Sequence, residues 1–513
     1  MAPKKVALFW PGDARAKPNE LALPNVEEAT AQLERALRKL GREPYRVPGF
    51  LSKPHESIER LGPIDDPMIG VSVHWFYGPH TTDGVTGKDN PLLLASNFSG
   101  RWPGLVGLLN TGACLEMLKR PFSRLWTDAP DFSSDPAFME RLDEWCSSGR
   151  IAYATDEIAF SAPVSPAATS LARQVADEIR RRRVLILMLG DTSMGMINGY
   201  FGPRLLHPHG FAEHKIDQAW IIDRGRRITD ARIDEAFAFV KAKGVTFHWG
   251  ERGATDFDER ATKEQLRDYL AVLDMIGEYK ADCLGWQYQL GLIPLRPPSD
   301  FAEGLFNSAC RPESNGDTIA CATEADQGNV VPMEMLKRLL VKKGLHQAVM
   351  FHDVRWGAVH PSDPKRFLWV LLNSGSCGAY AFNHDPNTLR GAHSYRQPPG
   401  YFPTPGGTLA GESLPGEITW ARAYIKKGEL WMDVGKGEVV KLPPKVRDQW
   451  WEGTTRQWPF MAADLGVSRD TLMAHFLSNH VAVAYGDVFG EMVALSQELG
   501  FKVRVWGKKA FGG

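Results

Sequence analysis

The stretch CATEADQGNVVPMEMLKRLL, residues 321–340, joins the end of an apolar strand to a helix through a turn that carries two acids, Glu324 and Asp326. The helix is predicted after Pro332 with one core-facing stripe of apolar residues at helical spacing: Met333, Leu336 and Leu340. Acids ahead of a helix are often only caps or dipole partners. The functional weight of Glu324 therefore depends on what the rest of the chain places beside it.

Toward the N-terminus the chain alternates predicted strands with predicted helices. The first segment has strands at 6–10 and 68–76 and helices at about 26–40, 103–118 and 136–146. After the linker-like SAPVSP, 161–166, a long helix leads to a strand at 184–189, helices at about 230–243 and 262–277, and strands near 245–248 and 282–288. This alternation is typical of parallel sheets covered by helices. We therefore expect two N-terminal α/β domains with parallel, Rossmann-like sheets, at residues 1–170 and 171–350.

The pattern changes after AVMFHDV, residues 348–354. Short alternating or aromatic-rich runs separated by Gly/Pro turns predict strands in LWVLLN, AYAFN, EITWARAYI and ELWMDV. A helix near 487–499 and a last strand, KVRVW, close the chain. The expected C-terminal domain, 351–513, is mainly antiparallel β, so the fold class is α/β with a β-rich third domain.

Composition narrows the classes of partner. The 513 residues suggest about three domains, and 60 basic residues nearly balance 61 acidic ones, which argues against a nucleic-acid or anionic-membrane partner and fits a small neutral ligand best. The longest apolar run, Val184 to Leu189, is too short to span a bilayer, and the six cysteines form no CxxC pair. We expect a cytoplasmic protein with reduced thiols. Aromatics in loops such as QPPGYFPTPGG, 397–407, suit either subunit contacts or a sugar-stacking surface.

Two further stretches place polar residues at the ends of apolar runs: Asp353 in FHDVRWG, 351–357, and Asn479 with His480 in FLSNHVAVAYGD, 476–487. Each has a structural alternative, since Asp353 could cap a turn or pair with Arg355, and His480 could be a buried core histidine. Together with Glu324 they supply two carboxylates and one imidazole, a mixed set of ligands that suits Mn²⁺ or Mg²⁺.

Other catalytic patterns find little support. GDTSMG, 190–195, follows a strand but lacks both the GxGxxG pattern and the lysine of a P-loop. The chain has no HExxH motif, no GxSxG elbow and no cysteine in a nucleophile signature. Neither nucleotide chemistry nor covalent hydrolysis is predicted.

The ordered set of motifs resembles the L-fucose isomerase family, within the L-fucose and L-arabinose isomerase group. The matching pieces are VLILMLGDTSMGM (184–196), LGWQYQ (284–289), CATEAD (321–326), FHDVRW (351–356), LLNSGS (371–376), PGEITWARAYIKKGEL (415–430) and SNHVAVAYGD (478–487). The resemblance implies two α/β domains before a β-rich one, and interconversion of an aldose and a ketose. It also implies a trimer or hexamer in which the first domain of one subunit helps cover a neighbour's site.

The resemblance carries a site over to this sequence. Mn²⁺, or alternatively Mg²⁺ or Co²⁺, would be held by Glu324, Asp353 and His480. Glu324 and Asp353 would also shuttle protons through a cis-enediolate, which the metal stabilises as a Lewis acid. Sugar hydroxyls would meet four residues: Gln287, Asn373, Ser374 and Asn479. Gln289 is nearly as good a candidate as Gln287, Asp326 is expected to support the loop or a ligand, and Arg15, Trp75 and Trp102 are the candidates to reach a neighbouring site.

Two alternatives stay open. The first is an isomerase with the same site that acts on a modified or acidic sugar, uronic or sulfonated, because the first segment diverges most where the substrate cover is expected. The second is a non-catalytic sugar-binding homologue. The presence of all three carried-over ligands argues against the second, since a binding protein has no need of them.

Overall fold

The computed structural model describes residues 4–97, 104–191 and 194–507. Its N-terminal part is one five-stranded sheet in the order β2-β1-β3-β4-β5, with every pair parallel. The strands are β1 (Lys5–Pro11), β2 (Glu43–Leu51), β3 (Met68–Ser72), β4 (Leu92–Asn97) and β5 (Ser123–Thr127). The helices are α1 (Ala16–Lys39), α2 (Pro54–Leu61), α3 (Pro79–Val85), α4 (Leu105–Met117) and α5 (Pro136–Ser148). Helix α1 begins ten residues before the predicted start at 26 and contains Pro24.

A second parallel sheet has the order β11-β10-β7-β8. Its strands are β7 (Val184–Leu189), β8 (Phe211–Ile216), β10 (Cys283–Trp286) and β11 (Cys321–Thr323). The helices of this part are α6 (Pro166–Arg182), α7 (Gly202–Leu206), α8 (Ala219–Gly225), α9 (Asp230–Ala242), α10 (Glu259–Tyr279), α11 (Asp300–Phe306) and α12 (Gln327–Lys342). The run predicted as a strand at 245–248 pairs elsewhere, as β9 (Thr246–Phe247) against β14 (His393–Ser394).

The C-terminal part is a closed barrel of six antiparallel strands. Its order is β15-β18-β12-β13-β17-β16, and a pairing of β16 with β15 completes the ring. The strands are β12 (Val349–His360), β13 (Asp363–Leu372), β15 (Gly416–Lys426), β16 (Glu429–Val439), β17 (Phe460–Asp464) and β18 (His480–Tyr485). Strand β19 (Lys502–Trp506) adds parallel to β16, and β6 (Ile158–Ala159) adds antiparallel to β19. The helices are α13 (Tyr380–Asn383), α14 (Pro444–Thr454), α15 (Arg469–His475) and α16 (Phe489–Glu498).

The predicted fold class is confirmed: two parallel sheets with helices precede an antiparallel barrel. Two local expectations were wrong. AYAFN forms the short helix α13 and not a strand, and the residue after it, His384, adopts φ of 52°, which ends the helix in a turn. Helix α12 starts directly after Asp326 and runs through Pro332, and it is buried on nearly every side, so one stripe understates its packing.

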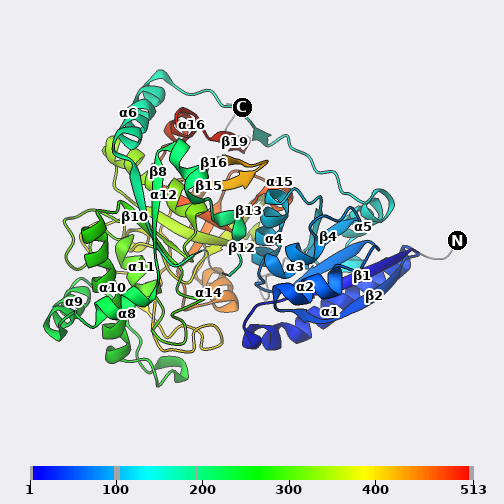
Figure 1. Ribbon diagram of the computed structural model, residues 1–513, viewed down its shortest axis with the longest axis horizontal. Helices are drawn as coiled ribbons and strands as arrows, with labels where there is room; N and C mark the ends of the chain where they lie inside the picture. The colour runs from blue at the N-terminus through cyan, green and yellow to red at the C-terminus, as the bar shows by residue number, and fades with distance from the viewer. Residues whose placement is uncertain (1–3, 98–103, 192–193, 508–513) are drawn as a thin grey trace.

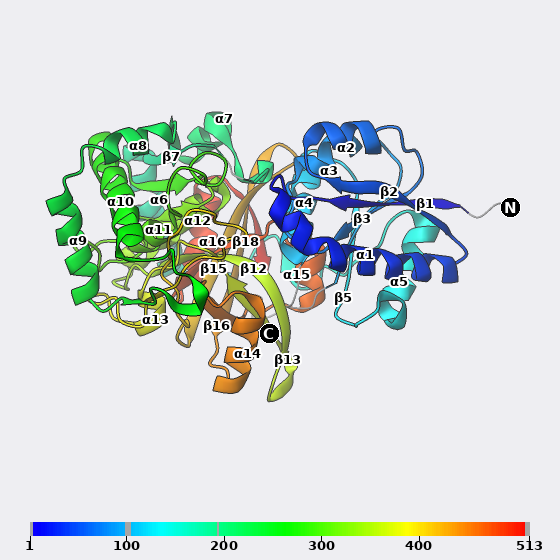
Figure 2. The same ribbon diagram turned by 90° about the horizontal axis from the view of Figure 1, so that it is seen from below.

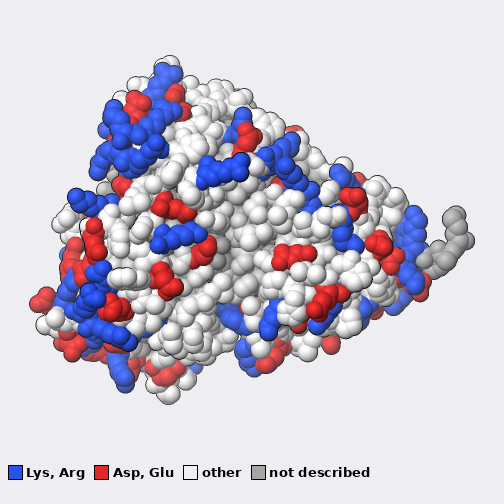
Figure 3. Space-filling view, in the orientation of Figure 1, with Lys and Arg blue, Asp and Glu red and all other residues white. Residues whose placement is uncertain are grey.

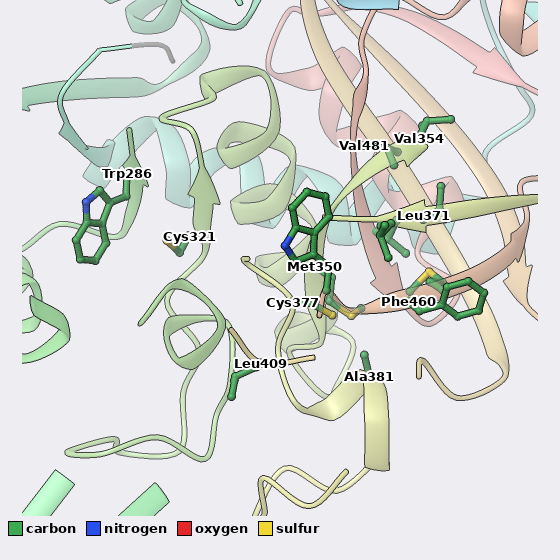
Figure 4. Packing of buried hydrophobic residues seen from close by; sticks show 14 of the residues in the cluster. Trp286, Cys321, Met350, Val354, Leu371, Cys377, Ala381, Leu409, Phe460 and Val481 are labelled. Atoms are coloured by element: carbon green, nitrogen blue, oxygen red, sulfur yellow. The ribbon is translucent and has the colours of Figure 1, made fainter. Parts of the chain in front are cut away.

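A continuous hydrophobic core joins the second sheet to the barrel. Figure 4 shows Trp286 and Cys321, from β10 and β11, in the same cluster as Met350, Leu371 and Val481 of the barrel strands. These side chains are almost fully buried. Because sheet and barrel share one core, the ends of β10, β11, β12 and β18 are held in fixed positions relative to one another.

The N-terminal sheet with its helices forms a lobe at one end of the molecule in both ribbon views (Figures 1 and 2). Arg124 of β5 ties the lobe to the barrel, since its buried guanidinium donates to the carbonyl oxygen of Phe476 at 2.7 Å. Trp126 adds a hydrogen bond from Nε1 to Asp470 at 3.1 Å. Residues of the lobe can therefore contribute to a site at this junction.

The face in Figure 3 carries both signs of charge beside much uncharged surface. Basic side chains gather over α6, whose last turn contains Arg180, Arg181 and Arg182. Within the described ranges, no helix combines the length and apolar character needed to cross a membrane.

Candidate active site

Glu324 stands where β11 turns into α12, in a strained backbone. Glu324 and the following Ala325 both have positive φ, 60° and 51°, and left-handed backbone costs a non-glycine residue roughly 1–2 kcal/mol. The Ala325 N–H is held by the Trp286 carbonyl oxygen at 3.1 Å. Such strain persists where the surroundings over-determine it, which is typical of functional sites. The turn leaves the Glu324 side chain in a pocket and not in the helix.

Asp326 supports two elements at once. Its Oδ1 accepts a hydrogen bond from the Gly328 N–H at 2.8 Å and caps α12. Its Oδ2 accepts from His480 Nδ1 at 2.7 Å and from the guanidinium of Arg422. Gly328 makes room for that guanidinium, because a Cβ at this position would overlap it. The expectation that Asp326 supports the loop is confirmed, and Arg422 is a partner that the sequence did not reveal.

His480 is oriented by Asp326. Since Nδ1 donates its proton to that carboxylate, Nε2 faces two other acids, with Asp353 Oδ1 at 3.0 Å and Glu324 Oε2 at 3.7 Å. Burial opposes the charged imidazole, but Asp353 and Asp326 outweigh it and raise the pKa of His480 to about 9. The carboxylates that favour a proton on Nε2 would equally favour a bound cation between the three side chains.

Asp353 is held from both neighbouring strands of the barrel. It is opposite His480 in the pairing of β12 with β18 and opposite Leu372 in the pairing with β13. Asn479 donates from Nδ2 to Asp353 Oδ1 at 3.1 Å, and Asn373 donates from Nδ2 to Oδ2 at 3.4 Å. The two amides fix the orientation of the carboxylate.

Glu324 is the second carboxyl group that faces His480. Burial raises its pKa to about 7, against the attraction of His480 and with a further contribution from Asp353. Gln289 donates from Nε2 to Glu324 Oε1 at 3.2 Å. A carboxyl group with this pKa can both accept and return a proton near neutral pH.

The three side chains fit a hard divalent cation. Neighbouring ligands of an octahedral Mg²⁺ or Mn²⁺ ion lie about 3 Å apart, because bonds of about 2.1 Å meet at right angles; the observed separations from Nε2 are 3.0 and 3.7 Å. The carboxylate behind His480 is the usual partner of a metal-bound histidine. Within residues 4–97, 104–191 and 194–507, no group of three or more His, Cys, Asp or Glu is arranged so that it could hold a metal ion as it stands. The inference of a metal site therefore rests on the kinds of ligand atom present and on the fact that they face one another.

The pocket around these acids is lined by all three parts of the chain. Its residues are Arg15, Trp75, Val106, Met194, Gln289, Glu324, Asp353, Arg355, Ser374, Tyr401, Phe402, Trp458, Asn479 and His480. Arg15 and Trp75, which were named only as candidates to reach a neighbouring site, line the pocket of their own chain. Trp102 lies outside the described residues.

The four predicted substrate residues fall in different places. Ser374 and Asn479 line the pocket. Asn373 does not line it, but it donates a hydrogen bond to Asp353, which does. Gln287 lies along a second pocket, and its Oε1 accepts from Gln218 Nε2 at 2.7 Å. Gln289 faces Glu324 instead. Of the two glutamines that follow β10, Gln289 is therefore the one whose side chain reaches the site.

Sequence reasoning missed several pocket residues. Tyr401 and Phe402 belong to the aromatic Gly/Pro loop at 397–407, whose composition did point to a sugar-stacking surface, but Trp458, Arg355 and Met194 carried no such signal. Four pocket-lining side chains have buried polar atoms without a partner in the described part of the protein: Trp75 Nε1, Gln289 Oε1, Arg355 Nε and Asn479 Oδ1. Both donors and acceptors are thus available to the hydroxyl groups of a ligand.

We expect Asp326→Asn to weaken Mn²⁺ binding about 10- to 100-fold, because the amide no longer fixes the tautomer and orientation of His480. Isothermal titration of the metal-free protein with MnCl₂ measures the change. Asp258→Asn is the matched control, since Asp258 also caps a helix, α10, but lies outside the pocket. Equal Mn²⁺ affinity of a folded Asp326→Asn variant and the parent protein would contradict this role.

One comparison with known proteins bears on this geometry. Residues 371–507 match the family model described as L-fucose isomerase, C-terminal domain. The match confirms the resemblance to the fucose isomerase family and supports a sugar isomerase. It covers Asn373, Ser374, Asn479 and His480, whereas Glu324 and Asp353 lie before it. No curated protein sequence matches the chain.

Proposed function

We propose that this chain, whose C-terminal part matches the L-fucose isomerase family, is a metal-dependent aldose–ketose isomerase that acts on an open-chain sugar through a cis-enediolate. One observation carries the proposal. Glu324 directly follows β11, whereas Asp353 lies on β12 and His480 on β18. In one pocket, a carboxylate oxygen of Asp353 lies 3.0 Å from His480 Nε2 and one of Glu324 lies 3.7 Å from it.

Glu324 and Asp353 can be given roles that account for both hydrogens that move in the reaction. An aldose becomes a ketose when the hydrogen on C2 moves to C1 and the proton of the C2 hydroxyl moves to O1. Glu324 takes the proton from C2 and returns it to C1, which its position in the pocket and its raised pKa allow. Asp353, which also faces His480 Nε2, carries the proton between O2 and O1. A bound Mn²⁺, or alternatively Mg²⁺ or Co²⁺, supplies a Lewis acid for the charge that develops on these oxygens.

Neighbouring side chains prepare these two acids. Asn479 and Asn373 hold Asp353, Gln289 holds Glu324, and Asp326 keeps the proton on His480 Nδ1 so that Nε2 is available as a ligand. The unpartnered polar atoms of Trp75, Gln289 and Asn479 are the groups that we propose for contacts with sugar hydroxyls. Ser374 completes the substrate wall.

The wider assignments belong to the same proposal. The resemblance supports a sugar substrate and self-association as a trimer or hexamer, and the six cysteines without a CxxC pair support a cytoplasmic location with reduced thiols. The domain boundaries at 170 and 350 likewise stay predictions. Light scattering coupled to size-exclusion chromatography measures the number of subunits.

Removal of the metal is expected to abolish the activity and its return to restore it. The purified protein is treated with EDTA, dialysed, and assayed with and without MnCl₂ against aldoses, deoxyaldoses, and uronic and sulfonated sugars, with the ketose detected by NMR. Since Lewis-acid stabilisation of the enediolate is lost without the metal, we expect turnover only after Mn²⁺ is added. Undiminished turnover by the metal-free protein would overturn the mechanism. A metal-free protein that binds sugar but turns over none would favour the non-catalytic alternative.

A further inference from the structure

Arg355 presents a cation to the active-site pocket without an acidic partner. It follows Asp353 by two residues on β12 and lines the same pocket. Arg355 is half-buried; its Nε is buried and has no hydrogen-bond partner within the described residues, and its guanidinium forms no ion pair with any of them. A buried N–H left without an acceptor is costly, which indicates that a ligand in the pocket completes it.

The local structure of β12 positions this side chain. Val354 pairs with Leu371 and Trp356 pairs with Val370, so Arg355 is the extra residue of a β-bulge. Bulges next to active sites commonly re-aim a side chain. The Arg355 guanidinium lies 5.7 Å from the centre of the Trp458 ring, and that ring is fixed by a hydrogen bond from its Nε1 to Gln397 at 2.6 Å. The cation is therefore held against a rigid aromatic surface.

The other charged side chains in and behind the pocket are each compensated by an opposite charge. Arg15, the second pocket cation, is paired with Asp13, through Nε to Oδ1 at 2.9 Å and Nη2 to Oδ2 at 2.6 Å. Behind the pocket, Asp326 is paired with Arg422. Glu324 and Asp353 together would balance one divalent cation. Arg355 then remains as one positive charge without compensation, although the chain as a whole is nearly neutral.

The spacing along the strand matches the length of a sugar. Two residues of a regular β-strand span about 6.6 Å, and because the bulge at Arg355 bends the strand, this is an upper limit for the separation between the positions of Asp353 and Arg355. Five carbon–carbon bonds of about 1.5 Å give an extended six-carbon chain a length of about 6 Å. A sugar with C1 and C2 beside Asp353 thus brings its far end to Arg355.

We propose that the substrate is an open-chain aldose with an anionic group at the end remote from the aldehyde, and that Arg355 binds this group. The class comprises carboxylate, sulfonate and phosphate derivatives of a six-carbon sugar, all of which accept charge-assisted hydrogen bonds from a guanidinium. This assignment rests on the proposed isomerase function and names its substrate class. It replaces the neutral ligand that the overall charge balance suggested.

The test compares matched sugars on the Mn²⁺-loaded protein. The kcat/KM is measured for glucose, galactose and mannose and, for each, for the 6-uronate, the 6-deoxy-6-sulfonate and the 6-phosphate. We expect one anionic series to exceed its neutral parents by about 10- to 100-fold, the range of one charge-assisted interaction. In Arg355→Gln this preference is expected to disappear, so that kcat/KM becomes similar for the anionic sugar and its neutral parent, and Arg355→Lys is expected to recover part of it. Comparison of the carboxylate, the sulfonate and the phosphate shows which anionic group the site prefers.

Binding of non-reacting analogues separates this inference from the isomerase proposal. The alditols that correspond to each neutral and anionic sugar have no carbonyl group, and their binding is measured by calorimetry. Arg366→Gln is the matched control, because Arg366 pairs with Asp464 and Glu438 away from the pocket. Anionic alditols that bind through Arg355 in a protein that turns over no sugar would overturn the isomerase and keep the anion site. Two outcomes would overturn the anion site alone. In the first, neutral and anionic compounds bind and react equally well. In the second, the preference for the anion survives in folded Arg355→Gln and Arg355→Lys variants.

Discussion

Glu324→Gln is expected to lower kcat by about 10²- to 10⁴-fold, the usual contribution of a positioned acid–base group. The amide cannot take the proton from C2, and it replaces one of the charged oxygen donors that face His480. Gln289 can still contact the new side chain, so the fold should be kept. Steady-state rates on the preferred aldose, together with the melting temperature, measure both effects.

The control for this change is Glu412→Gln. Glu412 pairs with Arg447 outside the pocket, and its loss should leave kcat unchanged. The Glu324 variant should also bind the corresponding alditol, since most of the pocket wall is intact. If kcat of a folded Glu324→Gln protein stayed within about threefold of the parent, a role for Glu324 in proton transfer would be excluded.

Arg422→Met is expected to be the most destabilising single change at the site. Arg422 and Asp326 are paired with both side chains fully buried, and removal of one partner from such a pair costs about 3–5 kcal/mol of the free energy of unfolding. Burial alone would raise the pKa of Asp326, but Arg422 and His480 lower it to about 2. Without the guanidinium, Asp326 would be left as an uncompensated buried charge behind the metal ligand.

Denaturant and thermal unfolding of the metal-free protein measure this loss. The double variant Arg422→Met with Asp326→Asn is the informative companion, because removal of both charges should recover part of the stability that the single variant loses. If Arg422→Met unfolded at the same denaturant concentration as the parent, Asp326 would not depend on Arg422. The arrangement of Asp326 behind His480 would then need another explanation.

Much of the fold follows from simple patterns. VLILML, a compact apolar run between Arg183 and Gly190, became β7 with the predicted bounds. KVRVW, which alternates basic and apolar residues before Gly507, became β19 with the predicted bounds. AYAFN misled because its aromatic residues pack in the connection that follows β13 and need no strand to do so; Tyr380 lies against the rings of Tyr485 and His384. An aromatic-rich run indicates burial more reliably than it indicates the backbone conformation.

The site was predictable because its residues lie beside apolar runs, although Asp353 lies inside β12 and not at the strand end that the sequence suggested. The pairing of Asp353 with His480 in neighbouring strands brings two residues together that are far apart in the sequence, and the order of motifs already suggested it. Gln287 and Gln289 could not be separated from the sequence, because the φ of 53° at the intervening Tyr288 decides which amide turns toward Glu324. Arg355 was considered only as a possible partner of Asp353. Its bulge, which places it in the pocket, depends on the register between β12 and β13.

The most direct test of the account follows hydrogen at C2 of the substrate. The Mn²⁺-loaded protein is incubated with its preferred aldose in D₂O, and the C2 proton signal is followed by NMR beside the EDTA-treated protein and the Glu324→Gln variant. If Glu324 shuttles the proton through a cis-enediolate, deuterium should enter C2 with the loaded parent protein and with neither of the other two. Conversion to ketose without any deuterium from solvent at C1 or C2, or exchange that persists in Glu324→Gln, would contradict the central claim.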